Sequence, residues 1–467
     1  MTRDVRCISY GGCDGEVSGS KHILEIDGNQ YMIDCGAWQG TDDAQERNKK
    51  FTFPTKKLRA VFLTHAHFDH CGLLPKLIKD GYTGSIRSTP ATRDLASIVM
   101  FDSARIQMYE PAGAAYDEND VVETINHFRC HAYEKEKKLD EKLTYTMYDA
   151  GHILGSSMLD ISTPRQKTFL QKLLHKEDDN MHILFTGDLG RKSNPITKKP
   201  ATNMPAPDYI FLESTYGNKT HESLEHCYSE LEAVINNTIK RKGKVIIPSF
   251  AVERAQELIY YIKQLMSSKR IPYVPVYVDS PMASNATGVF SIHPECLNDK
   301  IVKEFISKGK NPFSVRSLKF VRDCKESLEI AKSKEPAIII AANGMCEAGR
   351  IINHLKEGVS NSKNTILIVG YMGEGTLGRK ILDKEETLTI DKKEYKLKAE
   401  VHKINAFSAH ADYEEILEWL HEIDTSKLKK IFLVHGDTDA QEFLQNLLKQ
   451  ECISCEIVKE GEVRKLI

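Results

Sequence analysis

An apolar segment, "AVFLT" at residues 60–64, leads directly into "HAHFDH", which places three histidines and an aspartate within six residues. An apolar run of this length predicts a short buried strand. In an extended backbone, His65 and His67 lie two residues apart and project to the same side. Histidines at the end of a buried strand need partners, and a metal ion satisfies several of them at once. A histidine-rich surface turn is the alternative, and a metal-binding loop is the favoured interpretation.

Three later segments repeat this arrangement, in which an apolar strand is followed by a metal-binding residue type beside a glycine. They are "DAGHILGS", "LFTGDLG" and "IFLVHGD", which contain His152, Asp188 and His435. A single histidine or aspartate at a strand end is usually a turn or capping residue. Because all three segments share the arrangement, we expect their side chains to converge with the first cluster at one edge of a sheet.

The composition is that of an ordinary globular protein, with 41% apolar and 28% charged residues in a chain of 467, long enough for two or three domains. No apolar run has the length of a transmembrane helix and the N-terminal segment lacks a hydrophobic signal-peptide core, so we expect no membrane association and a cytoplasmic location. The eleven cysteines form no regular framework, which favours free thiols in a reducing compartment. With a net charge of -2, an acidic polymer has to be bound by a local basic surface.

The pattern of strands and helices changes along the chain. The first part is rich in strands, and Asp27-Gly28 between two apolar segments predicts a hairpin. From Asp208 onward strands alternate with helices, which predicts a parallel sheet with strands within 209–215, 244–250, 274–280, 337–344 and 365–371. Past about Lys396 the first pattern returns, beginning with residues 400–410. We therefore expect one domain interrupted by another, with the charged stretch 165–180 as an exposed insertion whose role the sequence leaves open.

Three strand-to-helix junctions of the interrupting domain, "IIPSFAVERAQE", "AANGMCEAGR" and "GYMGEGTLGR", carry glycines or arginines. In parallel sheets ligands collect beyond the carboxyl ends of the strands, and free backbone N–H groups at helix starts bind anions. One such junction is unremarkable, whereas three within one domain favour a phosphate-rich ligand. The residues we expect to bind it are Ser249, Arg254, Asn343, Gly344, Arg350, Gly378 and Arg379.

The motifs together resemble a known family. "THAHFDH" matches the HxHxDH signature of the metallo-β-lactamase fold, and "IDCG", "GHILGS" and "GDLG" match its other motifs in order. The later "LEST", "SAHAD" and "VHGD" resemble motifs A, B and C of the β-CASP subgroup, which includes the endonuclease subunit of the cleavage and polyadenylation factor and the DNA-repair nuclease Artemis. The resemblance implies an α/β fold: a metallo-β-lactamase αββα sandwich over 1–208 and 397–467, with an inserted β-CASP domain, a parallel sheet flanked by helices, over 209–396.

The resemblance also implies a site for two Zn²⁺ ions per chain, with Mn²⁺ or iron as substitutes. The ligands of one ion would be His65, His67 and His152, those of the other Asp69, His70 and His435, and Asp188 would bridge both. Such a pair supplies a bridging hydroxide as nucleophile and offsets the charge of a phosphodiester. The resemblance also gives a part in catalysis to the ligand Asp69, to His410 as general acid and to Glu213 as the partner of His410. Asp34 would support the histidine loop from behind, and the alternative for this residue is an aspartate that caps a turn.

The activity implied is that of a ribonuclease that hydrolyses phosphodiester bonds of single-stranded RNA in RNA processing or decay, with an endonuclease expected and a 5′–3′ exonuclease left open. In this family a histidine at motif C, here His435, goes with members that act on RNA. Three other functions remain: a DNA nuclease of the Artemis type, a hydrolase of small molecules, and a catalytically silent RNA-binding scaffold. A silent scaffold would be expected to have lost ligands, and this chain has all seven. RNA sequence preference, protein partners and assembly into a homo-oligomer are left open.

Overall fold

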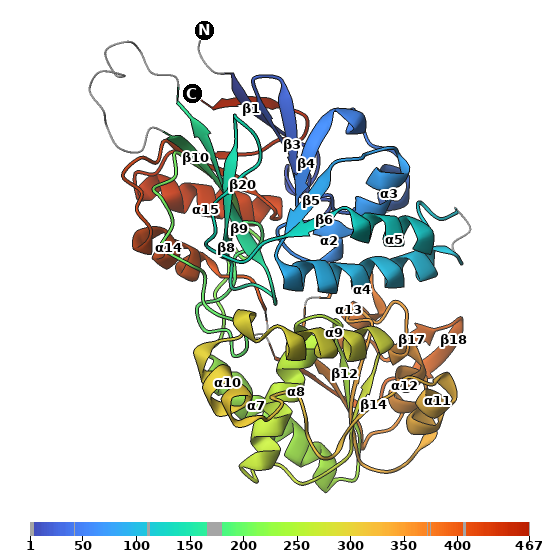
Figure 1. Ribbon diagram of the computed structural model, residues 1–467. Coiled ribbons are helices and arrows are strands. Elements are labelled where there is room, and N and C mark those ends of the chain that lie inside the picture. The colour runs from blue at the N-terminus through green and yellow to red at the C-terminus, as the bar shows by residue number, and fades with distance from the viewer. Residues whose placement is uncertain are drawn as a thin grey trace. The chain divides into compact units, whose positions relative to one another are not determined.

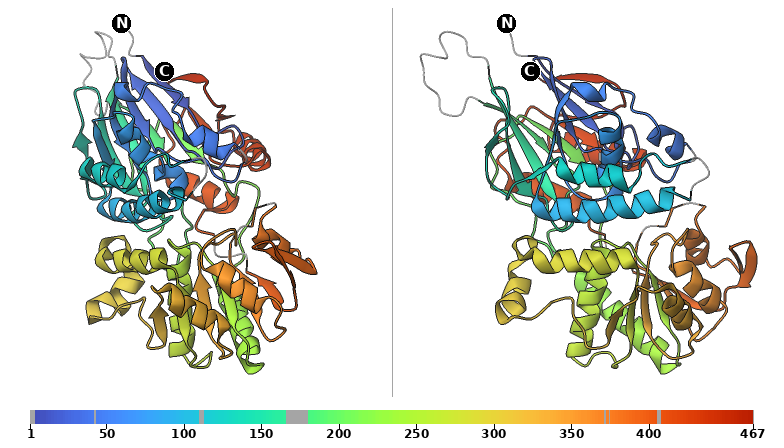
Figure 2. Two further views of the ribbon diagram at one scale, coloured as in Figure 1. Left: turned by 90° about the vertical axis from the view of Figure 1, so that its right-hand side faces the viewer. Right: turned by 45° about the vertical axis from the view of Figure 1, so that its right-hand side comes forward.

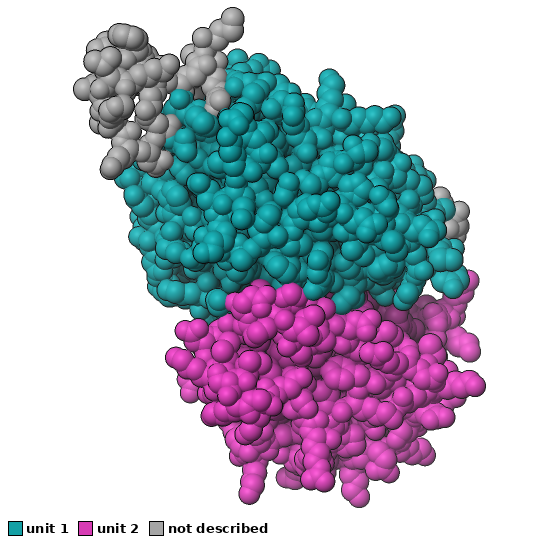
Figure 3. All heavy atoms as spheres, in the orientation of Figure 1, with its two compact units in different colours: residues 1–220, 410–467 teal, residues 221–409 magenta. Residues whose placement is uncertain are grey.

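The computed structural model describes residues 4–41, 43–109, 113–165, 180–370, 372–373, 375–404 and 408–466. The chain forms two compact units (Figure 3). Unit 1 contains residues 1–220 and 410–467, and unit 2 contains residues 221–409. The charged stretch at 165–180 that the sequence predicts as an exposed insertion lies, apart from its two end residues, outside the described residues.

Unit 1 contains two seven-stranded sheets (Figure 1). The first has the order β22-β1-β2-β3-β4-β5-β6, formed by Val463–Leu466, Val5–Ser9, His22–Ile26, Asn29–Ile33, Leu58–Phe62, Ser85–Ser88 and Phe128–Cys130. The predicted hairpin is confirmed as β2 and β3, with Asp27 and Gly28 at φ of 48° and 81° in its turn. From β3 to β6 the pairing is parallel, so the carboxyl ends of these strands meet at one edge.

The second sheet has the order β21-β20-β11-β10-β9-β8-β7. Its strands are Cys455–Ile457, Lys430–Val434, Tyr209–Glu213, Asn180–Phe185, Ser157–Pro164, Thr144–Asp149 and Lys137–Lys138. The strands from β10 to β21 are parallel neighbours, whereas β7 to β10 pair antiparallel. Functional residue types follow the ends of four of these strands: His152 follows β8, Asp188 follows β10, Ser214 and Thr215 follow β11, and His435 follows β20.

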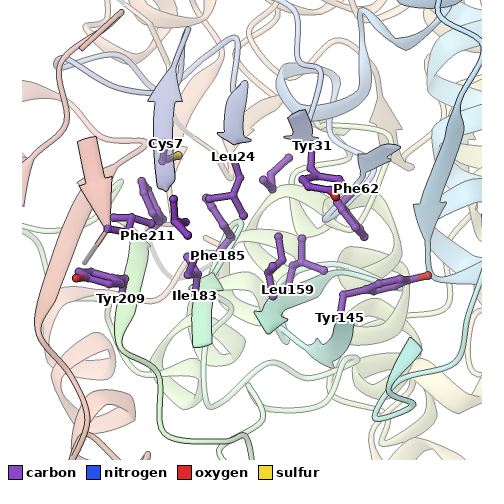
Figure 4. Close-up of a cluster of buried hydrophobic side chains, with 14 of the residues drawn as sticks. Cys7, Leu24, Tyr31, Phe62, Tyr145, Leu159, Ile183, Phe185, Tyr209 and Phe211 are labelled. Atoms are coloured by element: carbon purple, nitrogen blue, oxygen red, sulfur yellow. The ribbon is translucent and has the colours of Figure 1, made fainter. Parts of the chain in front are cut away.

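The core of unit 1 lies between the two sheets (Figure 4). The first sheet contributes Leu24, Tyr31 and Phe62, and the second contributes Leu159, Phe185 and Phe211 among others. The rings of Phe185 and Phe211 stack with centroids 4.5 Å apart. Each large apolar side chain buried here contributes roughly 1.5–3 kcal/mol to folding, which holds the two sheets face to face.

Helices cover the outer faces of both sheets of unit 1, which completes an αββα sandwich (Figures 1 and 2). Beside the first sheet are α1 to α5, formed by Ala44–Asn48, Phe68–Cys71, Leu74–Lys79, Pro90–Gln107 and Glu118–Asn126. Beside the second are α14 (Tyr413–Glu422) and α15 (Thr438–Gln450), which bury Trp419 and Leu444 against Ile210 and Leu433. α4 begins with Pro90, and the side chain of Thr89 accepts a hydrogen bond from Thr92 N, the pattern expected of a helix start.

Unit 2 contains a six-stranded sheet in which every pairing is parallel, as the sequence predicts for the interrupting domain. Its order is β14-β13-β15-β12-β16-β19, formed by Leu318–Phe320, Val276–Asp279, Ile338–Ala341, Val245–Pro248, Thr365–Ile368 and Glu400–Lys403. The helices are α7 to α13, at Leu224–Lys240, Arg254–Ser267, Pro281–Ile292, Asp299–Glu304, Cys324–Lys332, Ile351–Gly358 and Leu377–Leu382. A separate hairpin pairs β17 (Thr387–Ile390) with β18 (Lys393–Lys396).

Two strands belong to a different sheet from the one expected. Tyr209–Glu213, predicted as the first strand of the interrupting sheet, pairs in unit 1 with β10 and β20. Glu400–Lys403, predicted with the returning first domain, is instead the edge strand of the unit 2 sheet beside β16. The reason is the same for both: a short strand's pattern reports its burial and not its pairing partner. The boundaries at 208 and 396 stay predictions.

In the part of the chain that the structure describes, no helix combines the length and the apolar character needed to span a lipid bilayer.

Candidate metal centre

Three histidines and one aspartate meet at the ends of β4, β8 and β10. His65 Nε2 lies 3.1 Å from His67 Nδ1, which in turn lies 3.2 Å from His152 Nε2. Asp188 Oδ2 is 3.2 Å from His65 Nε2 and 3.4 Å from His152 Nε2. Gly187 takes a φ of 53°, and a Cβ there would lie 2.8 Å from that of Thr64, so the glycine lets this loop approach β4 closely.

A second group lies directly beside the first. His70 Nε2 is 3.2 Å from His435 Nε2, which is 3.3 Å from Asp69 Oδ2. Asp69 and His70 are held on the short helix α2, and His435 follows β20 in the left-handed region at φ 49°. The two groups share Asp188, because its Oδ1 lies 3.2 Å from His70 Nε2 while its Oδ2 faces the first group.

The spacing of these atoms fits metal ligation. In a tetrahedral zinc site with Zn–N bonds of about 2.0–2.1 Å, neighbouring ligand atoms are about 3.3 Å apart. In the first group, the separations His65–His67, His67–His152, His65–Asp188 and His152–Asp188 lie between 3.1 and 3.4 Å, and that from His67 to Asp188 is 4.0 Å. Within the described residues the buried Asp188 Oδ1 accepts no hydrogen bond. Imidazole nitrogens and carboxylate oxygens suit zinc, manganese and iron.

Burial sets the charge of the histidines. It lowers the pKa of His65 to about 4 and that of His152 well below its usual value. Both imidazoles are therefore neutral at pH 7 and can offer a lone pair to a cation. Burial acts in the same direction on His70, but the charges of Asp188 and Asp34 outweigh it and raise the pKa of that histidine.

Asp34 lies behind the histidine loop, with its Oδ2 2.7 Å from His70 Nδ1. Its Oδ1 accepts hydrogen bonds from the backbone N–H and the hydroxyl of Thr64. The Thr64 hydroxyl oxygen also lies 3.1 Å from His65 Nδ1. A carboxylate on the second ring nitrogen orients a ligating histidine. Thr215 does the same for His435, with its hydroxyl 3.0 Å from Nδ1. Sequence reasoning missed both threonines, although each directly adjoins a motif residue, in "LTH" and "EST".

Lys21 is a further residue that supports the site and that the sequence analysis did not identify, because no local sequence signal marks it. Its ammonium group is fully buried and donates hydrogen bonds of 2.6 Å to the carbonyls of Gly19 and Gly36, 3.4 Å above the ring of Trp38. Burial lowers the pKa of this lysine to about 7. The lysine ties together two loops on which α2 rests, because Ser20 N donates to the carbonyl of Asp69.

His410 pairs with Glu213 next to the first ligand group. Its Nδ1 lies 2.9 Å from Glu213 Oε1 and 3.9 Å from Asp188 Oδ2. Burial alone would lower the pKa of His410, but the charges of Glu213 and Asp188 outweigh it and raise the pKa to about 9. A histidine held in its charged form beside a reacting centre can donate a proton.

The residues predicted to bind phosphate all lie in unit 2, at the carboxyl edge of its sheet or in the helix starts that follow. Ser249 follows β12 and its N–H donates to Ala341 O, and the side chain of Asn343 accepts from Met345 N. Gly378 N donates to Met345 O, so the start of α13 lies against the β15 turn.

The three predicted arginines differ in their surroundings. Arg254 is buried in an ion pair with Glu257. Arg350 donates to Asp279 Oδ1 and to the carbonyls of Val321 and Arg322 at 2.6–2.9 Å, which makes it a structural tie. Arg379 pairs with Asp383 and keeps 44% of its side chain exposed. Of the three, Arg379 offers the most accessible guanidinium.

Three family models match the chain in the order of its motifs. Residues 23–198 match the metallo-beta-lactamase superfamily domain, residues 255–381 the Beta-Casp domain, and residues 394–458 a domain described as Zn-dependent metallo-hydrolase RNA specificity domain.

Similar proteins span nearly the whole chain. It is 32% identical over 458 residues to Ribonuclease TTHA0252 of Thermus thermophilus, covering 98% of this chain and 99% of that protein. It is 31% and 33% identical to proteins named Transcription termination factor FttA from Methanosarcina mazei and Pyrococcus horikoshii, covering 93% of this chain and 67% of each relative. The crystal structure of a protein of unknown function from Enterococcus faecalis V583 superposes with a TM-score of 0.56 over 99% of this chain and 100% of that one, at 13% identity, a likeness of fold alone.

Proposed function

Because the chain belongs to the β-CASP branch of the metallo-β-lactamase family, we propose that it is a zinc-dependent ribonuclease that hydrolyses phosphodiester bonds of single-stranded RNA. The observation that carries the proposal is the pair of ligand groups that share the two oxygens of Asp188. The full-length similarity to a protein named ribonuclease supports the substrate class.

The proposed ligands of the two metal ions are the seven residues of the two groups. His65, His67 and His152 would hold one ion, Asp69, His70 and His435 the other, and Asp188 both. When bound, such a pair supplies an activated water as nucleophile and positive charge that offsets the phosphodiester. Asp34, Thr64 and Thr215 hold the ligating imidazoles in position through their second nitrogens.

His410 would move the proton. Its charged imidazole is kept in place by the buried Glu213, whose Oε1 also accepts from Leu189 N and whose Oε2 accepts from Thr215 N. A carboxylate fixed in this way cannot swing toward a metal, so it remains the partner of the histidine. Protonation of the leaving 3′ oxygen is the step for which a general acid is needed, because an alkoxide is a poor leaving group.

RNA is favoured over DNA by two features, the histidine at position 435 and the match of residues 394–458 to a domain described by RNA specificity. A DNA nuclease and a silent RNA-binding scaffold are the alternatives. Retention of all seven ligand residues argues against the scaffold.

The test is incubation of the purified protein with labelled single-stranded RNA and, separately, with labelled single-stranded DNA. Each substrate is tested with untreated protein, with chelator, and after zinc is restored. We expect cleavage of RNA that chelator abolishes and zinc restores, with internal products from a substrate whose two ends are blocked. The His65→Ala protein is the matched control for a contaminating nuclease. Cleavage that persists in chelator, or that is equal for His65→Ala, would overturn the proposal; cleavage of DNA alone would redirect it to the DNA nuclease.

A further inference from the structure

Phe250 follows β12, one of the two central strands of the unit 2 sheet. β12 lies between β15 and β16, and all three run parallel, so their carboxyl ends form one edge. Phe250 is the second residue after β12, whereas β15 and β16 end in turns that contain Gly344 and Gly370. The ring therefore stands where ligands of parallel α/β sheets gather.

Phe250 is exposed in an otherwise buried turn. It keeps 43% of its surface exposed, while its neighbours Ser249 and Ala251 are buried. A Cβ at position 344 would lie 2.9 and 3.0 Å from the Cδ2 and Cε2 atoms of the ring, and one at 370 would lie 3.6 Å from Cε2. Two glycines thus make room for one edge of the ring, and a side chain at 344 would displace it.

The turn that carries the ring is fixed by hydrogen bonds. Ser249 N donates to Ala341 O at 2.9 Å, and the Ser249 hydroxyl donates to the carbonyl of Phe250 at 3.0 Å. The Asn343 side chain fixes the facing turn by accepting from Met345 N at 2.7 Å. A ring held in this way loses little conformational freedom when a ligand binds to it.

An exposed aromatic ring beside phosphate-binding chemistry fits a nucleobase. The β15 turn that contacts Phe250 also contacts the start of α13, where Arg379 keeps 44% of its side chain exposed. Proteins that bind single strands combine basic groups that meet the backbone with aromatic rings on which bases stack, and stacking tolerates any base because each has a π face.

We propose that Phe250 is a stacking platform for one base of the single-stranded RNA. This rests on the proposed ribonuclease function and adds to it a contact that does not depend on base identity. It also assigns a role to the two glycine turns, which leave room for one edge of the ring.

The test is equilibrium binding of metal-free protein to a labelled single-stranded RNA and to versions with one abasic nucleotide at each position in turn. Base–aromatic stacking is worth about 1–3 kcal/mol per base, so Phe250→Ala should weaken binding of the intact RNA roughly 5- to 150-fold. One abasic position should weaken binding to the wild-type protein and have little further effect on Phe250→Ala. Phe250→Trp should bind at least as well as the wild type.

The matched control is Phe443→Ala, which removes a phenylalanine of similar exposure, 45%, from α15 of unit 1 and should leave binding unchanged. Phe250→Leu keeps an apolar side chain without a π face, and its deficit should approach that of alanine. Unchanged affinity of Phe250→Ala, or equal affinity of leucine and phenylalanine at 250, would overturn the stacking role while the ribonuclease proposal stands. Absence of RNA binding by the metal-free wild type would also overturn the stacking role, whereas the ribonuclease proposal is decided separately by the cleavage assay on the zinc-loaded protein.

Discussion

His410 Nδ1 lies 2.9 Å from Oε1 of Glu213, a carboxylate with no exposed surface. Both oxygens of Glu213 also accept backbone N–H groups, from Leu189 and Thr215. The carboxylate is thus fixed before any substrate binds, and it holds the imidazole in one orientation beside the proposed metal ligands. This pairing separates the group proposed to transfer a proton from the groups proposed to bind metal.

We predict that His410→Ala keeps its metal and binds RNA but cleaves it about 10²–10⁴-fold more slowly, the usual worth of a general acid. The deficit should shrink on a nitrophenyl phosphodiester, because nitrophenolate leaves without a proton. The measurement is the cleavage rate of wild type and variant on both substrates, with the zinc content of each. Equal deficits on the two substrates, or loss of zinc, would assign His410 another role. Glu213→Gln should show the same pattern more weakly.

Removal of the shared carboxylate should affect both metal ions. Because Asp188 Oδ2 faces the first group and Oδ1 the second, Asp188→Ala should lower zinc content more than His65→Ala, which removes a ligand of one group. Elemental analysis after gentle dialysis measures zinc per chain, and close to two ions are expected in the wild type. Both variants should lose cleavage. Wild-type zinc content in Asp188→Ala would exclude the bridging role.

Lys21→Met should destabilise the protein and weaken the second metal position. Two buried carbonyls, of Gly19 and Gly36, would lose the lysine that donates to them, at a cost of about 1–3 kcal/mol for each unsatisfied group. A Cβ on Gly36 would lie 1.5 Å from the carbonyl oxygen of Asp69, so movement of this loop must move α2. Thermal unfolding with and without zinc measures both effects, and the exposed Lys79→Met serves as control. If Lys21→Met has the melting temperature and zinc content of the wild type, Lys21 does not fix the two loops on which α2 rests.

Asp149 should make stability fall between about pH 4 and pH 7. Burial raises the pKa of its carboxyl to about 7, so in this range the folded protein keeps a proton that the unfolded chain releases, and the free energy of unfolding decreases as pH rises. Asparagine mimics the protonated acid and can still accept from Gly151 N. Asp149→Asn should therefore remove this slope and gain about 1–3 kcal/mol at pH 8, a value reduced for the partial exposure of the residue. Denaturant unfolding of both chelator-treated proteins at several pH values measures the free energy of unfolding. If this free energy changes with pH in the same way for the wild type and Asp149→Asn, the prediction is wrong.

Arg379→Ala should weaken RNA binding and reduce the log–log salt slope by about 0.7, the value for one lost phosphate contact on a single strand. Its metal content and melting temperature should stay close to those of the wild type, because its ion pair with Asp383 joins two partly exposed side chains, and such surface pairs contribute little to stability. Arg350→Ala should instead lower the melting temperature, since it ties Asp279 to two backbone carbonyls. An unchanged salt slope in Arg379→Ala would remove this residue from the RNA-binding surface.

The candidate site was largely predictable because its residues follow a local rule. Each segment that carries predicted ligands follows an apolar strand, and a glycine close by in the chain lets the backbones approach, so the motifs carry the information within a few residues. The parallel sheet of unit 2 was predictable for a similar reason, since strands that alternate with helices rarely pair in any other way.

The sequence by itself therefore determined the residue types of the site, the two-part organisation and the class of chemistry proposed. Only the tertiary structure decided that Tyr209–Glu213 pairs with β10 and β20, that Lys21 is buried beneath the histidine loop, and that Phe250 is exposed after a buried strand. Local patterns report how apolar a segment is and where it turns. Strand pairing, the burial of a charge and the exposure of a ring are set by contacts between residues far apart in the chain, and such contacts leave no periodic trace in the sequence.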